Sequence, residues 1–246
     1  TIGANARRAF EKKVNTVIKN KVLSKYAELL GKEKKLILKQ NLKDVNYAKK
    51  LGVKNNLINR LLIDENKLKD IQNSIIKISK LKDPVGNTLE KWKRPNGLNI
   101  SKISIPIGVI GVIYESRPNV TSDVASLCFK SGNPVILKGG SEAINTNRIL
   151  AKIFRKALRI NKVDENFIQF IDTKQRRVVD IMLSSMKKYI DVIIPRGGKN
   201  LVKRVQDLSS VPIIGHLEGL CHTYVDRDAN LDMSKKIVYN AKLRNT

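Results

Sequence analysis

The chain has 246 residues, of which 41% are hydrophobic and 28% are charged. This length and apolar content suffice for a buried core in one large or two modest domains, and they exclude an intrinsically disordered chain. The longest nearly continuous apolar run, Ile105–Tyr114, is about half of the roughly 20 residues that a membrane span needs, so we expect no membrane partner.

The net charge of +26 is of the kind that ordinarily indicates a nucleic-acid or anionic-membrane partner. Residues 1–92 hold 22 basic and 9 acidic side chains and residues 93–246 hold 26 and 13, so each part carries +13. Lysine supplies 34 of the 48 basic residues, whereas phosphate and base recognition favours the arginine fork. We therefore prefer a solvated, lysine-rich surface without a nucleic-acid partner, and keep a basic nucleic-acid-binding protein as the alternative.

The two cysteines, Cys128 and Cys221, lie far apart and form no C-x-x-C motif, which argues against a metal site and a disulfide framework. A reducing, cytoplasmic setting fits this cysteine usage. Cys221 and His222 have the chemistry of a nucleophile and a base, but neighbours on an extended strand point to opposite faces and cannot form a dyad. Cys128 falls between Leu127 and Phe129 on a predicted helix, where a small buried hydrophobe is the preferred role.

Apolar residues at three- and four-residue steps predict packing helices over the first 80 or so residues. The pattern covers residues 10–30, 33–52 and 65–81, and a turn follows at Pro84 and Gly86. These helices are amphipathic, with lysines between the apolar positions, so we expect them to pack on another layer of structure.

From residue 98 the pattern changes to short apolar runs separated by helical stretches. Strands are predicted at LNISKISIP, which alternates, and at the buried runs GVIGVIY, PVILK, FIQFI, DVIIP and VPIIGHL. Alternating strands and helices predict an α/β fold with a doubly wound parallel sheet. We expect an N-terminal helical region over residues 1–97 and a dinucleotide-binding domain over residues 98–229.

Ligands bind an open parallel sheet at the carboxyl ends of its strands, so the residues after each apolar run are candidate site residues. Glycines there let backbone N–H groups approach a phosphate at a helix N-terminus, and Lys138 and Arg196 add full charges. The alternatives are turn glycines, a surface salt bridge for Arg117, a helix cap for Asn119, and Ser141 as the cap of the next helix. The loops are ESRPNVTSD (115–123), KGGSEA (138–143), RGGKN (196–200) and HLEGLCH (216–222).

Three long stretches resemble one known family: IPIGVIGVIYESRPNVTSDVASLCFKSGNPVILKGGSEA, DVIIPRGGKNLVKRV and VPIIGHLEGLCHTYVDRDANLDMSKKIVYNAKLRNT. They are similar to the gamma-glutamyl phosphate reductases, also called glutamate-5-semialdehyde dehydrogenases, the proline-biosynthesis branch of the aldehyde dehydrogenase superfamily. The resemblance extends upstream through the N-terminal helices. It implies an aldehyde-dehydrogenase-like fold, in which a Rossmann-type cofactor domain with a doubly wound parallel sheet follows those helices.

The resemblance implies an NADPH-dependent reduction of L-glutamyl 5-phosphate to L-glutamate 5-semialdehyde with release of phosphate. A cysteine thiolate would attack the acyl phosphate, and the thioester would accept the hydride of the cofactor. Glutamate 5-kinase would be the pathway neighbour, and the full-length parent is expected to be a homo-oligomer. A shortened relative that binds NADP(H) without catalysis is the alternative.

Site residues also follow from the resemblance. In an ungapped comparison His216 stands opposite the water-activating Glu of the hydrolytic relatives, with Glu218 two positions on, so both are candidate auxiliary residues. Arg117 and Asn119 would border the reacting carbonyl. The expected cofactor-binding residues are Lys138, Gly140, Ser141 and Glu142 at the adenosine ribose, and Arg196, Gly197 and Gly198 at the pyrophosphate.

Residues 230–246 are expected to begin a catalytic domain. Apolar positions that return to one side predict a helix there, and neither Gly nor Pro ends it. In the family, the segment similar to NAKLRNT leads directly into G-x-C-x-A, whose cysteine is the nucleophile. The printed sequence stops three residues before that position, so we expect the nucleophilic cysteine beyond Thr246 and no catalytic cysteine within this chain.

Overall fold

The computed structural model describes residues 1–115, 117–215 and 221–243, and it divides the chain into two compact units, Thr1–Gly215 and His216–Thr246. The described part of the second unit contains helix α10 (Leu231–Lys242), whose first turn is capped by the Asn230 side chain. Over the described residues, every helix is too short or too polar to cross a lipid bilayer.

The first unit alternates helices and strands as the sequence predicts. Its helices are α1 (Ile2–Phe10), α2 (Thr16–Lys32), α3 (Lys34–Lys50), α4 (Asn55–Leu61), α5 (Glu65–Lys80), α6 (Asn119–Lys130), α7 (Ile144–Ile160), α8 (Arg177–Ser184) and α9 (Lys199–Leu208), with short 3₁₀ turns η1 (Ser141–Ala143) and η2 (Glu165–Phe167). Its strands are β1 (Thr88–Lys93), β2 (Asn99–Ile103), β3 (Ile110–Tyr114), β4 (Val135–Gly139), β5 (Ile168–Phe170) and β6 (Val192–Arg196).

The central sheet is parallel and has the strand order β5-β4-β3-β6. The chain moves outward from β3 through β4 to β5 and then returns to the other side of β3, so the order reverses between β3 and β6. In open α/β sheets such a switch point is where ligands bind. The register sets Tyr114 at the end of β3 beside Gly139 of β4 and Arg196 of β6, so three strands end at one level.

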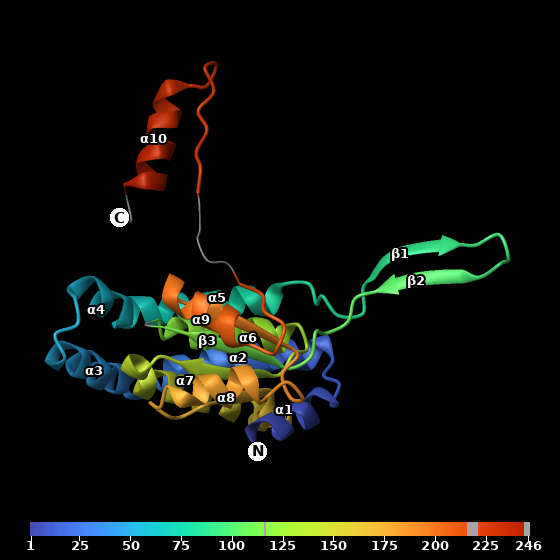
Figure 1. Ribbon diagram of the computed structural model, residues 1–246, viewed down its shortest axis with the longest axis horizontal. Helices are drawn as coiled ribbons and strands as arrows, with labels where there is room; N and C mark the ends of the chain where they lie inside the picture. The colour runs from blue at the N-terminus through green and yellow to red at the C-terminus, as the bar shows by residue number, and fades with distance from the viewer. Residues whose placement is uncertain (116, 216–220, 244–246) are drawn as a thin grey trace. The chain divides into compact units, whose positions relative to one another are not determined.

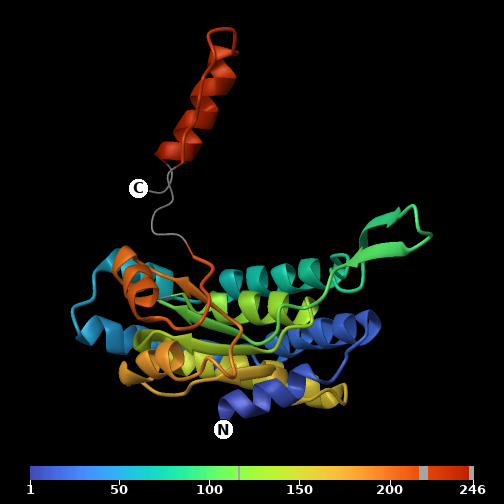
Figure 2. The ribbon, with the colours of Figure 1, turned by 45° about the vertical axis from the view of Figure 1, so that its right-hand side comes forward.

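Helices cover both faces of this sheet (Figures 1 and 2). Helices α2, α5, α6 and α7 pack on the face that carries Val112, Tyr114 and Leu137. Helices α1, α8 and α9 pack on the opposite face, which carries Ile113 and Ile136. Because successive side chains of a strand point to opposite faces, two covered faces require continuous apolar runs. The prediction of a doubly wound parallel sheet is confirmed.

The N-terminal helices share the core of the sheet. The Tyr26 ring of α2 lies 4.3 Å, centroid to centroid, from Phe154 of α7, and Phe129 of α6 meets Phe154 edge-on at 5.9 Å. The Tyr26 hydroxyl also shares a hydrogen bond of 2.6 Å with the Ser122 hydroxyl of α6. The N-terminal helices therefore pack onto the sheet within one compact unit. The functional boundaries expected after residues 97 and 229 stay predictions.

Two parts of the pattern differ from the predicted elements. The first predicted helix is broken, because α1 ends at Phe10 and the Asn15 side chain caps a new helix. The run VPIIGHL forms a single parallel bridge between Ile213 and Ile193 of β6 within the described residues, in place of a full strand.

The segment Thr88–Lys93, which falls in the region expected to be helical, is instead a strand. It pairs antiparallel with β2 in a two-stranded hairpin that projects from the first unit (Figure 1). All six residues of β1 are exposed, so no period-2 burial pattern marks the strand in the sequence.

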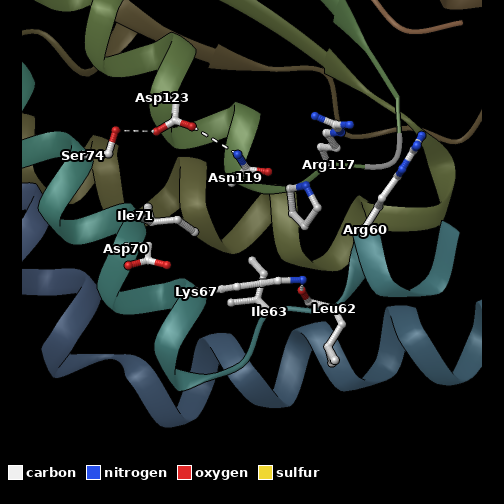
Figure 3. A pocket seen from close by; sticks show the side chains of 11 residues that line it. Arg60, Leu62, Ile63, Lys67, Asp70, Ile71, Ser74, Arg117, Asn119 and Asp123 are labelled. Carbon is white, nitrogen blue, oxygen red and sulfur yellow. Dashed lines mark hydrogen bonds between the residues drawn. The ribbon is translucent and has the colours of Figure 1, made fainter. Parts of the chain in front are cut away.

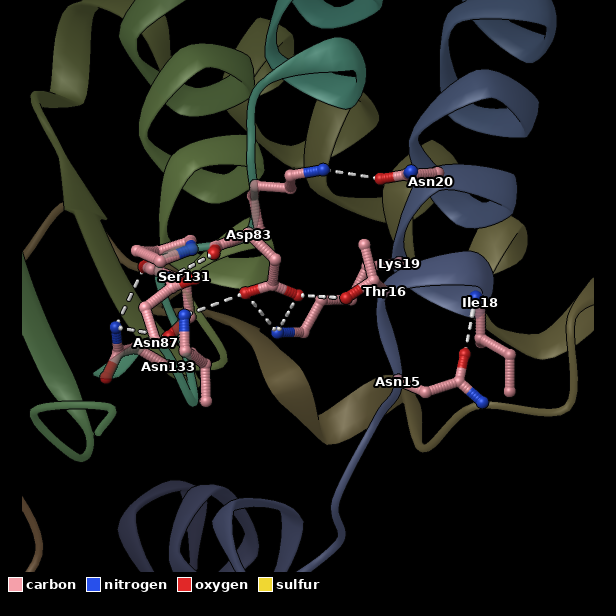
Figure 4. A network of polar contacts seen from close by, with 12 residues as sticks. Asn15, Thr16, Ile18, Lys19, Asn20, Asp83, Asn87, Ser131 and Asn133 are labelled. Atoms are coloured by element: carbon pink, nitrogen blue, oxygen red, sulfur yellow. Dashed lines mark hydrogen bonds and ion pairs between the residues drawn. The ribbon is translucent and has the colours of Figure 1, made fainter. Parts of the chain in front are cut away.

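A buried ion pair stands at the base of this hairpin (Figure 4). The Lys19 ammonium, whose side chain is 3% exposed, lies 2.9 Å from the Asp83 carboxylate. Asp83 also accepts hydrogen bonds from the Thr16 hydroxyl and the Val85 N–H. Burial by itself would raise the pKa of Asp83, but these hydrogen bonds and the Lys19 charge outweigh it, and the pKa lies below its usual value.

Replacing Asp83 by Asn leaves the Lys19 ammonium buried without a counter-charge, so we expect the free energy of unfolding at neutral pH to fall by about 3 kcal/mol. Because the folded state lowers the pKa of Asp83, its contribution is present above the unfolded pKa of about 3.9 and is lost as the pH falls through the folded pKa. The difference between parent and variant in urea unfolding should therefore shrink below about pH 4.

The matched control is Asp207→Asn, which changes an exposed acid on α9 and should alter stability by less than about 0.5 kcal/mol. An Asp83→Asn protein as stable as this control at neutral pH would contradict the assigned role of the pair.

Candidate active site

A cavity of about 310 Å³ lies at the carboxyl edge of the sheet, against the ends of β3 and β4 and the start of α9. A ligand-binding crevice is expected at this edge, because the strand order reverses between β3 and β6. Four of the residues predicted to bind the adenosine ribose line it together: Lys138, Gly140, Ser141 and Glu142.

Lys138 supplies a buried positive charge to this cavity. Its side chain is 6% exposed, and its ammonium donates a hydrogen bond of 2.8 Å to the Gly139 carbonyl. Burial lowers the pKa of Lys138, while the nearby Glu142 carboxylate opposes the change. Two of the three ammonium donors have no protein partner within the described part of the chain. They are available to oxygen atoms of a ligand.

Gly139, which ends β4, and Gly140, which follows it, keep this part of the cavity open. A Cβ atom at Gly140 would lie 2.2 Å from a carboxylate oxygen of Glu142. A Cβ atom at Gly139 would lie 2.2 Å from the buried Nδ2 of Asn147, which has no hydrogen-bond partner among the described residues. At Gly139 only glycine allows the backbone to approach so closely.

Ser141 does not cap α7, which differs from the prediction. Ser141 opens η1, and α7 begins after Ala143 without a side-chain cap from its own segment. Asp44 of α3 takes that role, because its carboxylate accepts hydrogen bonds from the Thr146 N–H at 2.8 Å and the Thr146 hydroxyl at 2.6 Å. An N-terminal helix thus positions the loop that lines the cavity.

The loop after β6 meets the loop after β3. The Glu115 carboxylate accepts a hydrogen bond of 2.9 Å from the Gly198 N–H, at the start of α9, and a Cβ at Gly197 would lie 2.5 Å from the same carboxylate. Arg196 contributes its carbonyl, which accepts from the Glu115 N–H at 3.1 Å, while its side chain is exposed and does not line the cavity. The Gly198 N–H is thus an anion-binding group at a helix N-terminus.

Several lining residues have no role of their own predicted from the sequence, although Glu115 and Asn200 fall within the candidate loops 115–123 and 196–200. Two of them, Lys174 and Arg176, come soon after the run FIQFI, so the rule that selected the other strand ends would also have selected this loop. The Arg176 guanidinium has no ion pair or hydrogen bond in the described part of the chain, whereas Arg204 is paired with Asp180 at 2.9 Å. The additional lining residues include Glu115, Lys174, Arg176, Asn200, Leu201 and Arg204.

Arg117 and Asn119 lie together in a second cavity of about 430 Å³, between α5 and the start of α6 (Figure 3). Pro118, and not Asn119, stands in the cap position of α6, so the helix-cap alternative for Asn119 is wrong. Arg117 forms no salt bridge with any described residue. The Asn119 amide donates to the Asp123 carboxylate at 3.2 Å, and the Ser74 hydroxyl donates to the same carboxylate. Burial raises the pKa of Asp123, and these two hydrogen bonds oppose the rise.

Neither cysteine is among the residues that line the two cavities. Cys128 is 6% exposed on α6, and burial raises the pKa of its thiol to about 12, so the predicted packing role is confirmed. Cys221 is exposed in the second unit, where its carbonyl accepts a hydrogen bond from the Lys242 ammonium. His216 and Glu218 lie outside the described residues. Among the described residues no cluster of three or more His, Cys, Asp or Glu could hold a metal ion.

The fold and site define a doubly wound α/β protein with a basic, glycine-lined cavity at the carboxyl edge of its parallel sheet. A family profile described as "Aldehyde dehydrogenase family" matches residues 2–246. The chain belongs to the aldehyde dehydrogenase family, whose members use nicotinamide cofactors.

Several similar proteins and two similar solved structures share one name. The gamma-glutamyl phosphate reductase of Clostridium tetani is 47% identical over 242 residues, which are 98% of this chain and 56% of the relative. The crystal structure of the enzyme of that name from Thermotoga maritima superposes with a TM-score of 0.92 at 37% identity, over 99% of this chain and 59% of that one. The Saccharomyces cerevisiae structure gives a TM-score of 0.81 at 33% identity, over 98% and 62%. The chain thus spans little more than half the length of these relatives.

The two glycines of the β4 loop should respond differently to Ala. Gly139→Ala drives a methyl group against the buried Asn147 amide and the Tyr114 ring, so we expect a loss of about 1–3 kcal/mol in stability. Gly140→Ala meets only the flexible end of Glu142 and has an ordinary backbone conformation, so its stability should change by less than about 0.5 kcal/mol. Urea unfolding of the two variants measures the contrast, and equal losses would contradict this geometry.

Proposed function

We propose that this chain is the cofactor-binding part of an NADPH-dependent gamma-glutamyl phosphate reductase. The reaction would be the reduction of L-glutamyl 5-phosphate to L-glutamate 5-semialdehyde with release of phosphate, a step of proline biosynthesis. The names of the relatives support the reaction. The observation that carries the cofactor assignment is the buried Lys138 ammonium beside Gly139 and Gly140, at the edge where parallel α/β sheets bind dinucleotides.

The residues at this edge fit a dinucleotide. Lys138 and the Glu142 carboxylate offer a donor and an acceptor to the 3′-hydroxyl of the adenosine ribose, and the Gly198 N–H at the start of α9 suits a pyrophosphate once Glu115 is displaced. The unpaired Arg176 guanidinium suits the 2′-phosphate that distinguishes NADP from NAD. Together these groups support a Rossmann-type arrangement. Bound there, NADPH would supply the hydride.

The second cavity would receive the acyl phosphate. The Asn119 amide and the Arg117 guanidinium both line it, and a donor and a cation suit the carbonyl and phosphoryl oxygens of that group. The reaction implied by the family also needs an accessible thiolate. Cys128 is buried with a raised pKa, and Cys221 stands more than twenty residues ahead of the position where the family has its nucleophile. Neither thiol suits the reaction.

We also propose that the full-length parent is a homo-oligomer. The projecting hairpin exposes several large apolar side chains. Monomeric soluble proteins rarely expose so many together, and such side chains are usually covered in protein–protein interfaces. They include Leu89, Trp92, Leu98 and Ile103.

Lys138→Ala should weaken NADPH binding about tenfold, because it removes a charged donor from the cavity. Arg176→Ala should weaken the binding of NADPH more than that of NADH, because only NADPH has the 2′-phosphate. Lys203→Ala, which removes an exposed lysine of α9 outside the cavity lining, is the control. Arg196→Ala in the same titrations tests the predicted pyrophosphate role of that residue.

Calorimetric or fluorescence titration gives these affinities. Parent-like NADPH binding by Lys138→Ala would contradict the assignment of the cavity.

The 246-residue chain should bind NADPH but have no reductase activity, because neither of its thiols suits nucleophilic attack. The assay follows NADPH consumption with enzymatically generated glutamyl phosphate, or the reverse reaction from the semialdehyde with NADP and phosphate. A protein extended through the family's G-x-C-x-A segment is the positive control, and its activity should vanish when that cysteine is changed to Ala. Turnover by the 246-residue chain that is lost in Cys221→Ser would contradict the expectation.

A further inference from the structure

A buried polar network connects the two cavities without lining either of them. Two of its members, Asn41 and Asp44, are 1% and 2% exposed and lie three residues apart on one face of α3. The third member is Thr146 at the start of α7, which is fully buried. Polar side chains at this depth destabilise a fold unless they are hydrogen-bonded, so their partners show which parts of the chain they hold in place.

Asp44 holds the chain on the side of the cofactor cavity. Besides the N–H and the hydroxyl of Thr146, its carboxylate accepts a hydrogen bond of 2.8 Å from the Asn145 amide. These bonds fix the first turn of α7, which follows the cavity-lining residues 140–142 closely along the chain.

Asn41 holds the chain on the side of the second cavity. Its Nδ2 donates to the Leu61 carbonyl at 2.9 Å, and its Oδ1 accepts from the Ile63 N–H at 2.7 Å. The amide therefore binds the backbone on both sides of Leu62, between the end of α4 and the start of α5. Because Leu62 and Ile63 line the cavity of about 430 Å³, Asn41 sets the position of its rim.

The Thr146 hydroxyl connects the two sides. It accepts a hydrogen bond of 3.2 Å from the Asn41 Nδ2 and donates one of 2.6 Å to Asp44. The direction of each bond is determined, because an N–H can only donate and a carboxylate can only accept. A continuous path of hydrogen bonds thus runs from the Ile63 N–H to the Asp44 carboxylate.

Apolar packing joins the same segments. Ala143, the last residue of η1, belongs to a small buried cluster with residues of α3 and α4, which are Val45, Ala48, Ile58 and Leu61. The loop at the cofactor cavity and the end of α4 are therefore held against α3 by packing as well as by hydrogen bonds.

We propose that Asn41 and Thr146 are positioning residues that couple the cofactor cavity to the second cavity. A cofactor that orders residues 140–146 restrains Thr146, and through Asn41 it restrains the backbone at Ile63. The rim then has less conformational freedom left to lose, so occupation of one cavity favours occupation of the other. The coupling rests on the proposed function for the identity of the two ligands, and on the hydrogen bonds alone for its path.

The first test measures amide hydrogen exchange by NMR in the 246-residue chain without a ligand. Thr146→Val keeps the shape of the side chain and removes the hydroxyl, so Asn41 loses one partner while the Ile63 hydrogen bond itself is untouched. We expect the ratio of exchange at Ile63 to exchange at Val112, a sheet amide that reports global unfolding, to rise about tenfold.

Two further variants separate the hydrogen-bond path from packing and from overall stability. Thr146→Ser restores the hydroxyl and should return this ratio to near the parent's value. Ser122→Ala removes an equally buried hydroxyl that is bonded to Tyr26 and lies outside the network, and should leave the ratio unchanged.

The second test adds saturating NADPH. In the parent, NADPH should slow exchange in residues 140–142 and also at Ile63. In Thr146→Val it should slow exchange in residues 140–142 alone. If NADPH does not bind the parent, the cofactor proposal fails, and the comparison without ligand still decides the coupling.

The inference is overturned if Thr146→Val leaves the ratio unchanged, if Thr146→Ser behaves like Thr146→Val, or if Ser122→Ala raises the ratio as much. Bound NADPH that leaves exchange at Ile63 unchanged in the parent would overturn it as well.

Discussion

Everything at the candidate site depends on the register of three parallel strands. Because Tyr114, Gly139 and Arg196 end β3, β4 and β6 at one level, the loops that follow meet at a single edge. The hydrogen bond from the Gly198 N–H to Glu115 joins two of those loops directly. A shift of one residue in the register of a strand would turn its side chains to the opposite faces of the sheet, and would separate groups such as Lys138 and Tyr114 that line the cofactor cavity.

The helices before the sheet complete the site. Asp44 of α3 caps α7 across about 100 residues of sequence and so fixes the turn that carries Ser141 and Glu142. Arg60 and Asp70, on α4 and α5, line the second cavity with Arg117. The same packing that buries Tyr26 against Phe154 therefore also positions polar groups at the site. The N-terminal helices and the sheet share one core and so form one compact unit.

The features of the site that could be predicted are those that depend on residues close together in the sequence. Buried strands appear in the sequence as apolar runs. Because ligands bind at the carboxyl ends of the strands of a parallel sheet, the residues just after those runs, such as Lys138 and Glu142, could be predicted as site residues. Contacts between residues far apart in the sequence leave no local pattern. The sequence therefore predicted Ser141 as the cap of α7 in place of Asp44, and it gave no sign that Arg60 and Arg117 line the same cavity. The fully exposed strand β1 was missed because an exposed strand shows no alternation.

The central claim is that a dinucleotide binds at the carboxyl ends of β3, β4 and β6. The most direct measurement is the structure of this chain in crystals grown with saturating NADPH. The account predicts the adenosine ribose between Lys138 and Glu142, the 2′-phosphate at Arg176, and Glu115 moved away from the Gly198 N–H. An NADPH molecule bound elsewhere on the chain, with Glu115 still on Gly198, would contradict it.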